Sequence, residues 1–156
     1  MQTWILKDFF AQHGAIPRDA FLTTFTGAFL LSRFHDEPPL VIFLERDKEF
    51  SILFGSDEDC DVDFVADPTM DAQHCRVAYH AGFQGWTVED LGSSFGTLLD
   101  ENRLAPQRPT LLSDRSVVKV GGGLLQLQFY EAATLADRIR SSGVTRSLKR
   151  KKGDDD

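Results

Sequence analysis

Residues 74–104, HCRVAYHAGFQGWTVEDLGSSFGTLLDENRL, decide the class of fold. The stretch contains three short apolar runs, HCRVAYH (74–80), GWTVED (85–90) and GTLLD (96–100), and the segments between them include Gly82 and Gly92. Short runs bounded by glycine and aspartate are typical of β-strands joined by turns, whereas a helix needs a longer periodic segment. The stretch therefore predicts successive strands with no helix between them.

The same pattern continues on both sides of that stretch. Towards the C-terminus, SVVKV (116–120) and LLQLQFY (124–130) flank Gly121-Gly122-Gly123, which predicts a hairpin turn. Towards the N-terminus lie AFLLSRF (28–34), VIFLE (41–45), FSILF (50–54) and CDVDFV (60–65). Alternation in CDVDFV and LLQLQFY places polar side chains on one face and apolar side chains on the other. Many short strands without long helices between them predict an all-β chain folded as an antiparallel β-sandwich.

The N-terminal residues carry a different pattern. In TWILKDFFAQH (3–13) apolar side chains recur four residues apart, which predicts a helix with Thr3 as its N-cap and Gly14 at its end. RDAFLTTF (18–25) predicts one or two further helical turns. The aromatic residues Trp4, Phe9 and Phe10 leave two interpretations open. We expect this helix to cover an edge or end of its own sandwich, and the alternative is packing against a second copy of the chain.

The C-terminal residues complete the predicted organisation. AATLADRIRSS (132–142) predicts a short helix, and the charged GVTRSLKRKKGDDD (143–156) predicts a disordered tail. We therefore expect a helical extension over 1–27, an antiparallel β-sandwich over 28–131, and a short helix with a charged tail over 132–156.

Composition and charge exclude several classes of protein. The 156 residues include 24 acidic and 17 basic ones, for a net charge of −7, and the length suits one domain. Ten acids lie between Glu45 and Asp71 against Arg46 and Lys48, and such a stretch repels nucleic-acid phosphates. No apolar run is as long as a membrane span, and two cysteines make no disulfide framework. We expect a cytoplasmic protein without cofactor, nucleic-acid or membrane contacts; in a eukaryote, Lys149–Lys152 would suit a nuclear signal.

One pattern imitates a catalytic site. Gly92-Ser93-Ser94-Phe95-Gly96 matches the G-x-S-x-G nucleophile elbow of hydrolases. That chemistry needs a helix after the serine and a histidine downstream, but a strand-like TLLD follows and no histidine lies beyond His80. A hydrolase is therefore a remote alternative, and we expect a turn and no enzyme.

Two further patterns imitate metal sites. Asp59, Asp61 and Asp63 resemble the start of a calcium loop, but the glycine and glutamate of that loop are replaced by Phe64 and Met70. The charged face of an edge strand explains the same acids. The remaining candidates, His74, Cys75, His80 and Cys60, lack the spacing of a structural zinc site, so we expect no metal.

Five segments carry a family resemblance, because they follow one another at the spacing of known landmarks. They are FSILFGS (50–56), CDVDF (60–64), MDAQHCRV (70–77), EDLGSSFGTLLDENRL (89–104) and TLLSDRSVVKVGGG (110–123). In this order they resemble the forkhead-associated (FHA) domain, a β-sandwich family that binds phosphothreonine peptides. The landmarks are a strand ending in Gly-Arg, a strand like Asn-Asp-Ile, Ser-x-x-His, Asp-x-x-Ser-x-Asn-Gly-Thr and a closing Leu…Gly-Asp…Ile-x-x-Gly.

The resemblance assigns altered chemistry to the family's binding positions. Where the family has an arginine that binds the phosphate, this chain has Ser56. The family's phosphate-binding serine is replaced by Asp71, and the asparagine that holds the peptide main chain is replaced by Phe95. The resemblance thus implies a partner-binding face of Gly55, Ser56, Asp71, Ala72, Ser93, Ser94, Phe95 and Arg103, and a structural motif of His74, Gly96 and Thr97.

These replacements predict a changed ligand. Phosphothreonine carries nearly two negative charges and needs charged donors, which Ser56 and Asp71 do not supply. We expect a non-catalytic protein–protein interaction module whose partner is a basic or amphipathic protein or peptide, bound without phosphate. Phe95 is the predicted anchor, with inward packing as the open alternative. The competing hypothesis is a phosphothreonine-peptide adaptor that uses relocated cations such as Arg103 or Arg108.

Overall fold

The computed structural model describes residues 1–47, 49–64 and 67–140. Its strands are β1 (Thr3–Ile5), β2 (Gly27–Phe34), β3 (Leu40–Glu45), β4 (Ser51–Gly55), β5 (Val62–Asp63), β6 (Cys75–His80), β7 (Gly85–Asp90), β8 (Thr97–Leu99), β9 (Asn102–Arg103), β10 (Thr110–Leu111), β11 (Val117–Val120) and β12 (Leu125–Glu131). The helices are α1 (Leu6–His13) and α2 (Arg18–Thr24), and residues 132–140 are also helical.

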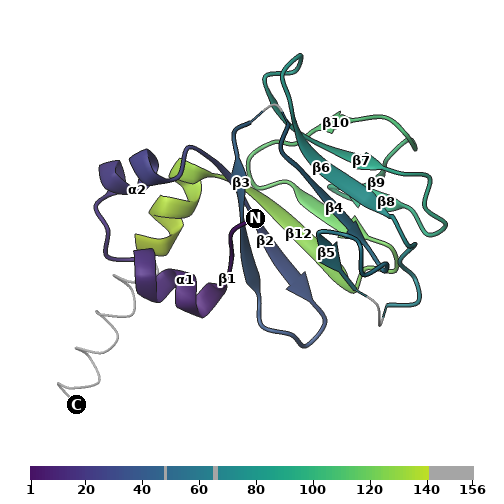
Figure 1. The fold of residues 1–156 in the computed structure, drawn as a ribbon, viewed down its shortest axis with the longest axis horizontal. Helices are drawn as coiled ribbons and strands as arrows, with labels where there is room; N and C mark the ends of the chain where they lie inside the picture. Colours follow the sequence, from purple (N-terminus) through teal and green to yellow (C-terminus); the bar gives the residue numbers. More distant parts are fainter. Residues whose placement is uncertain (48, 65–66, 141–156) are drawn as a thin grey trace.

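The strands form two sheets that pack face to face, which confirms the predicted β-sandwich (Figure 1). The seven-stranded sheet has the order β1-β3-β2-β12-β11-β8-β9, and the five-stranded sheet has the order β10-β7-β6-β4-β5. Neighbouring strands are antiparallel except β4 and β5, which are parallel. The hairpin predicted at Gly121-Gly122-Gly123 joins β11 to β12, as Val120 pairs with Leu125.

Two predicted elements begin or end elsewhere than expected. The helix predicted from residue 3 starts at Leu6, because Thr3–Ile5 pair with Leu40–Ile42 of β3 as an edge strand. Thr3 is therefore not the N-cap; Ile5 occupies that position and provides no side-chain hydrogen bond. The strand predicted over 60–65 is reduced to Val62–Asp63. It lies at the sheet edge, with Asp61 and Asp63 exposed as expected.

The main core lies between the two sheets. Alternate residues of each strand point inward, and the five-stranded sheet contributes buried side chains such as Ile52, Phe54 and Val77. The facing side chains of the seven-stranded sheet include Leu30 and Leu127. This core fixes the strand ends from which the binding loops extend.

A second core covers the outer face of β2, β3 and β12. α1, α2 and the helix over 132–140 pack there, and in Figure 1 these helices gather on the side of the seven-stranded sheet away from the other sheet. Five phenylalanines form a ring cluster with centroid distances of 4.9 to 6.1 Å: Phe9, Phe21, Phe25, Phe29 and Phe43. Phe9 is fully buried within the chain. The helix therefore covers its own sandwich as expected, but over the outer face of the seven-stranded sheet and not at an edge or end.

The C-terminal helix predicted over 132–142 is present over 132–140, and the predicted tail lies outside the described residues. Within the described residues, no helix is long and apolar enough to cross a membrane.

Candidate functional site

Three loops meet at one end of the sandwich, and backbone hydrogen bonds join the first two. The amide of Ser56, just after β4, donates to the Asp71 carbonyl at 2.9 Å, and the amide of Asp57 donates to the Ala72 carbonyl at 3.2 Å. The third loop, between β7 and β8, is joined by the Ser94 amide, which donates to the Asp71 carboxylate at 3.1 Å. Residues 55–57, 71–74 and 92–97 therefore form one continuous surface, hereafter the loop face.

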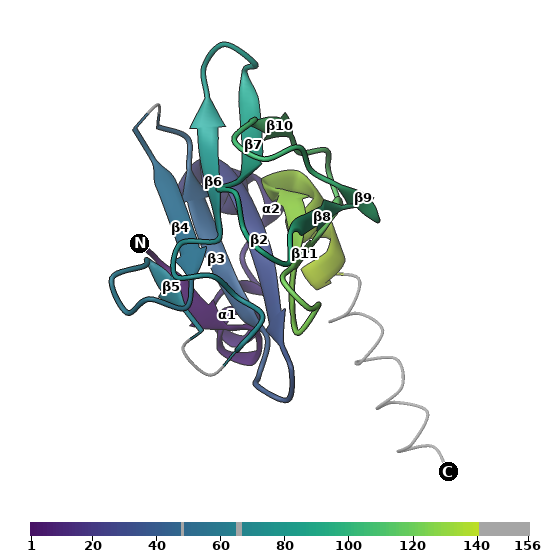
Figure 2. The same ribbon diagram turned by 90° about the vertical axis from the view of Figure 1, so that its right-hand side faces the viewer.

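The β6–β7 hairpin lies at the opposite end of the molecule. β6 begins at Cys75 next to the loop face and runs to His80, and β7 returns from Gly85 to Asp90. Figure 2 shows this hairpin projecting at the top of the molecule while β5 lies towards the bottom. The exposed Phe83 of the hairpin is thus far from the loop face.

His74 bridges the second and third loops from inside. Its ring is fully buried, its Nδ1 accepts a hydrogen bond from the Asp71 amide at 3.1 Å, and its Nε2 lies 2.8 Å from the Gly96 carbonyl. Because Nδ1 accepts, the proton is on Nε2 and the ring donates to Gly96. The side chain therefore fixes loop spacing and has no ring nitrogen left for a partner.

Asp90 organises the β7–β8 loop, although the sequence analysis did not single it out. Its carboxylate accepts hydrogen bonds from the Ser93 hydroxyl at 2.5 Å, the Thr97 hydroxyl at 2.7 Å, and the amides of Gly92 and Ser93 at 3.2 Å each. Burial alone would raise the pKa of Asp90, but these hydrogen bonds outweigh it and hold the pKa below the ordinary value. The spacing Asp-x-x-Ser in EDLGSS is the signal that marks this turn.

Ser93 and Thr97 are engaged within that network. The Ser93 side chain, which the resemblance placed on the partner-binding face, is buried and also accepts a hydrogen bond from the Gly96 amide at 3.0 Å. It lies in a loop between two strands, not at the turn from a strand into a helix that a nucleophile elbow requires. Because the Ser93 hydroxyl donates its hydrogen bond to Asp90, the side chain stabilises the loop.

Two glycines are required by the packing of these loops. A Cβ on Gly55 would lie 2.1 Å from the Ala72 carbonyl oxygen, so no side chain fits there. Gly96 has a φ of +85°, a backbone conformation that favours glycine, and its carbonyl accepts from both His74 and the Gly121 amide.

The outward side chains of the loop face carry little positive charge. Phe95 is 58% exposed, so the alternative that it packs inward is wrong. Ala72 and Ser94 are also exposed, and Ser56 and Asp71 are half-buried. The Arg103 side chain lies beside Gly96 of the loop face, since its Nε would be 2.9 Å from a Cβ built on that glycine.

The acidic residues beside the loop face are occupied by local hydrogen bonds. The Asp57 carboxylate accepts from the Asp59 amide at 3.0 Å, and the Asp61 carboxylate accepts from the Leu53 amide at 2.8 Å. In the part of the chain that the structure describes, no three His, Cys, Asp or Glu side chains gather as a metal site. Burial raises the pKa of both cysteine thiols, Cys60 and Cys75, which keeps them protonated.

Comparisons with known proteins agree with this arrangement. Residues 52–121 match the model of the FHA domain family. A stretch of 57 residues is 39% identical to an FHA domain-containing protein of Arabidopsis thaliana, covering 36% of this chain and 14% of that protein. The chain thus corresponds to a small part of that relative.

Solved structures of FHA domains share the fold. One is the N-terminal FHA domain of S. cerevisiae Rad53p in complex with a phosphothreonine peptide, with a TM-score of 0.56, 19% identity, and coverage of 67% of this chain and 93% of that one. Another is the FHA domain of CT664 from Chlamydia trachomatis, with a TM-score of 0.55, 21% identity, and coverage of 67% and 98%. Residues 52–121 of this chain therefore match the FHA domain family, and its β-sandwich has the fold of FHA domains.

Proposed function

We propose that this FHA domain, a non-catalytic interaction module, binds a protein partner through the loop face without requiring phosphothreonine. The observation that carries the proposal is the chemistry of the three outward positions. Ser56 offers one neutral hydroxyl, Asp71 presents a carboxylate, and Phe95 presents an exposed ring. None of these can donate a charged hydrogen bond to a phosphate.

Electrostatics add to this argument. The Asp71 carboxylate takes the Ser94 amide, a donor that would otherwise be available to a ligand. A phosphate beside Asp71 would meet a like charge, and losing one charged hydrogen bond costs roughly 1.5–3 kcal/mol. A loss of about 3 kcal/mol weakens binding more than a hundredfold.

The positive contribution to binding would come from Phe95. An aromatic ring on a loop tip buries little in the free domain and a large area in a complex. The neighbouring acids, Asp57 to Asp63, would favour a basic or amphipathic partner.

Capture of partners from a lysate tests this proposal. We expect a partner that is retained after phosphatase treatment and lost with Phe95→Ala, while the melting temperature stays unchanged. Phe83→Ala is the matched control, because Phe83 is 51% exposed at the opposite end of the molecule. Loss of all partners on dephosphorylation, or equal loss with Phe83→Ala, would contradict the proposal.

A second candidate, phosphothreonine binding by a relocated cation, is favoured by the position of Arg103. Its guanidinium lies against Gly96, on the loop face, with no hydrogen bond or ion pair to another described residue. If this candidate holds, Arg103→Gln abolishes binding of phosphothreonine peptides. The same binding measurement on Arg108→Gln tests Arg108, the other exposed arginine of the following loop.

A further inference from the structure

A cavity of about 550 Å³ lies on the outer face of the seven-stranded sheet, away from the loop face. It is lined by Arg115, Gln128, Tyr130, Thr134, Asp137 and Arg138. β12 starts beside the β11–β12 turn, whose Gly121 bonds to Gly96, and Tyr130 lies five residues further along. At about 3.3 Å per residue, this places the cavity roughly 17 Å from the loop face.

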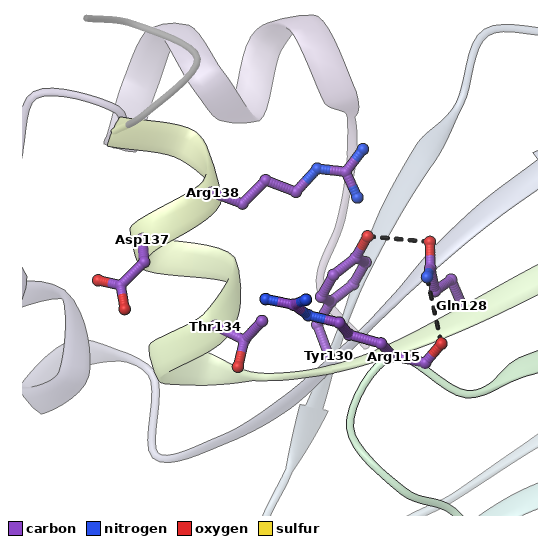
Figure 3. Close-up of a pocket in the computed structure, with 6 residues that line it drawn as sticks. All are labelled: Arg115, Gln128, Tyr130, Thr134, Asp137 and Arg138. Carbon is purple, nitrogen blue, oxygen red and sulfur yellow. Dashed lines mark hydrogen bonds between the residues drawn. The ribbon is translucent and has the colours of Figure 1, made fainter.

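Two arginines enter this cavity from different elements. Figure 3 shows Arg138 extending from the helix over 132–140 towards Tyr130, and Arg115 extending from the loop before β11 towards Thr134. The Arg138 guanidinium lies 5.3 Å from the centre of the Tyr130 ring, which stacks it by a cation–π contact. Neither guanidinium donates a hydrogen bond or pairs with a carboxylate among the described residues.

The position of Arg115 is fixed by its backbone. Its amide donates to the Phe129 carbonyl at 2.6 Å, and its carbonyl accepts from the Gln128 side-chain amide at 3.2 Å. Gln128 in turn accepts the Tyr130 hydroxyl proton at 2.9 Å. Arg115 has a φ of +71°, a conformation that favours glycine, yet an arginine stands there.

The acids near the cavity have other partners. Asp137 pairs with Arg18 of α2 at 3.0 Å. Asp114, adjacent to Arg115, accepts from the Glu131 amide at 2.9 Å and the Thr134 hydroxyl at 2.5 Å. Neither acid therefore pairs with Arg115 or Arg138, whose exposed side chains line the cavity in a chain with a net charge of −7.

We infer that this cavity is an anion-binding site in which Arg115 and Arg138 together hold a phosphoryl or carboxylate group. Planar guanidinium groups recognise both anions through paired hydrogen bonds, and Tyr130 holds one of them in place. The site is independent of the loop face and of what that face binds.

An NMR titration of the full chain with inorganic phosphate and, separately, with succinate tests this inference at constant ionic strength. We expect saturable shifts of the Nε–H resonances of Arg115 and Arg138 with at least one of the two anions. The anion that gives saturation identifies whether the site binds a phosphoryl or a carboxylate group. Arg76, an exposed arginine of β6 in the five-stranded sheet, serves as the internal control and should not saturate. No saturable shift with either anion, or saturation of Arg76 at the same concentration, overturns the inference.

Arg115→Gly separates binding from folding. Glycine relieves the positive φ, so we expect a melting temperature equal to or above that of the parent chain. Loss of one charged donor group should weaken anion binding by about tenfold or more. Arg138→Gln should weaken it similarly. Unchanged affinity in both variants contradicts the assignment.

Discussion

The buried and the outward parts of the loop face differ in how their polar groups are used. Beneath the surface, His74 bonds to the backbone of two loops, and Asp90 accepts four hydrogen bonds within the β7–β8 loop, from Gly92, Ser93 and Thr97. On the surface, Phe95 is exposed and the Asp71 carboxylate makes one hydrogen bond across the loops. The shape of the loops is therefore maintained independently of the side chains that they present, so those side chains can change without loss of the fold.

The largest effect on the buried part is expected from Gly55→Ala. The added methyl would lie 2.1 Å from the Ala72 carbonyl oxygen, so the first two loops must separate. We expect a loss of more than about 4 kcal/mol in unfolding free energy, or roughly 10 °C in melting temperature. Gly82→Ala is the control, since its Cβ would approach only the flexible His80 ring. Similar melting of the two variants would show that the loops do not pack as described.

Asp90→Asn should cause the second-largest loss of stability. The amide cannot accept from Ser93, Thr97 and Gly92 together, and its own N–H group would face backbone donors. We expect a loss of about 3 kcal/mol at neutral pH, measured by chemical denaturation. A loss below about 1 kcal/mol would mean that the network does not maintain the loop.

The pH dependence isolates the charge of Asp90. Because its folded pKa is lowered, its ionisation stabilises the fold above the ordinary pKa of about 3.9, and this contribution is lost as the pH falls through the lowered value. The stability difference between the parent chain and Asp90→Asn should therefore be widest above about pH 5 and narrow towards pH 3. A difference that is constant with pH would contradict this role.

His74→Ala should lower the unfolding free energy slightly less than Asp90→Asn does. It removes a fully buried ring and leaves the Asp71 amide and the Gly96 carbonyl without their partner. We expect a loss of about 2 kcal/mol and a melting temperature lower by roughly 5 °C. His80→Ala, on the exposed hairpin, should change melting by less than half as much; equal losses would refute a special role for His74.

Asp71→Asn should have the smallest effect on stability. Its side-chain oxygen can still accept from the Ser94 amide, and the site is half-buried. We expect a change below about 1 kcal/mol in a denaturant titration. A larger loss would mean that Asp71 belongs to the buried part of the loop face and not to its outward part.

The sequence predicted the sandwich and the loop residues because their signals are local. Strand alternation, the Gly121-Gly122-Gly123 hairpin and the segments around His74 and Gly96 are each contained in a few consecutive residues. The short β1 was missed because its pairing with Leu40–Ile42 is distant in sequence. The second core was signalled by the apolar face of the predicted N-terminal helix and by the unbroken apolar run from Ala28 to Leu31, which indicates a strand covered on both faces.

The site was predicted less completely, because its scaffold depends on side-chain geometry. The sequence indicated that Phe95 stands at a loop tip but not whether it points outward. The Asp-x-x-Ser spacing marked the turn at Asp90 but did not indicate that Ser93 is buried there, and nothing in the sequence indicated that Arg103 folds over Gly96. Arg115 and Arg138 are brought together only by packing of the C-terminal helix on β12.

Calorimetric titration with a phosphothreonine peptide library and with the same peptides unphosphorylated tests the central claim most directly. If the buried scaffold keeps the loops in place while Ser56, Asp71 and Phe95 have replaced the phosphate contacts, the two libraries should bind equally, with an affinity ratio near one. A peptide that binds with a dissociation constant of about 10 µM or less only when phosphorylated, roughly −7 kcal/mol in binding free energy, would contradict the account.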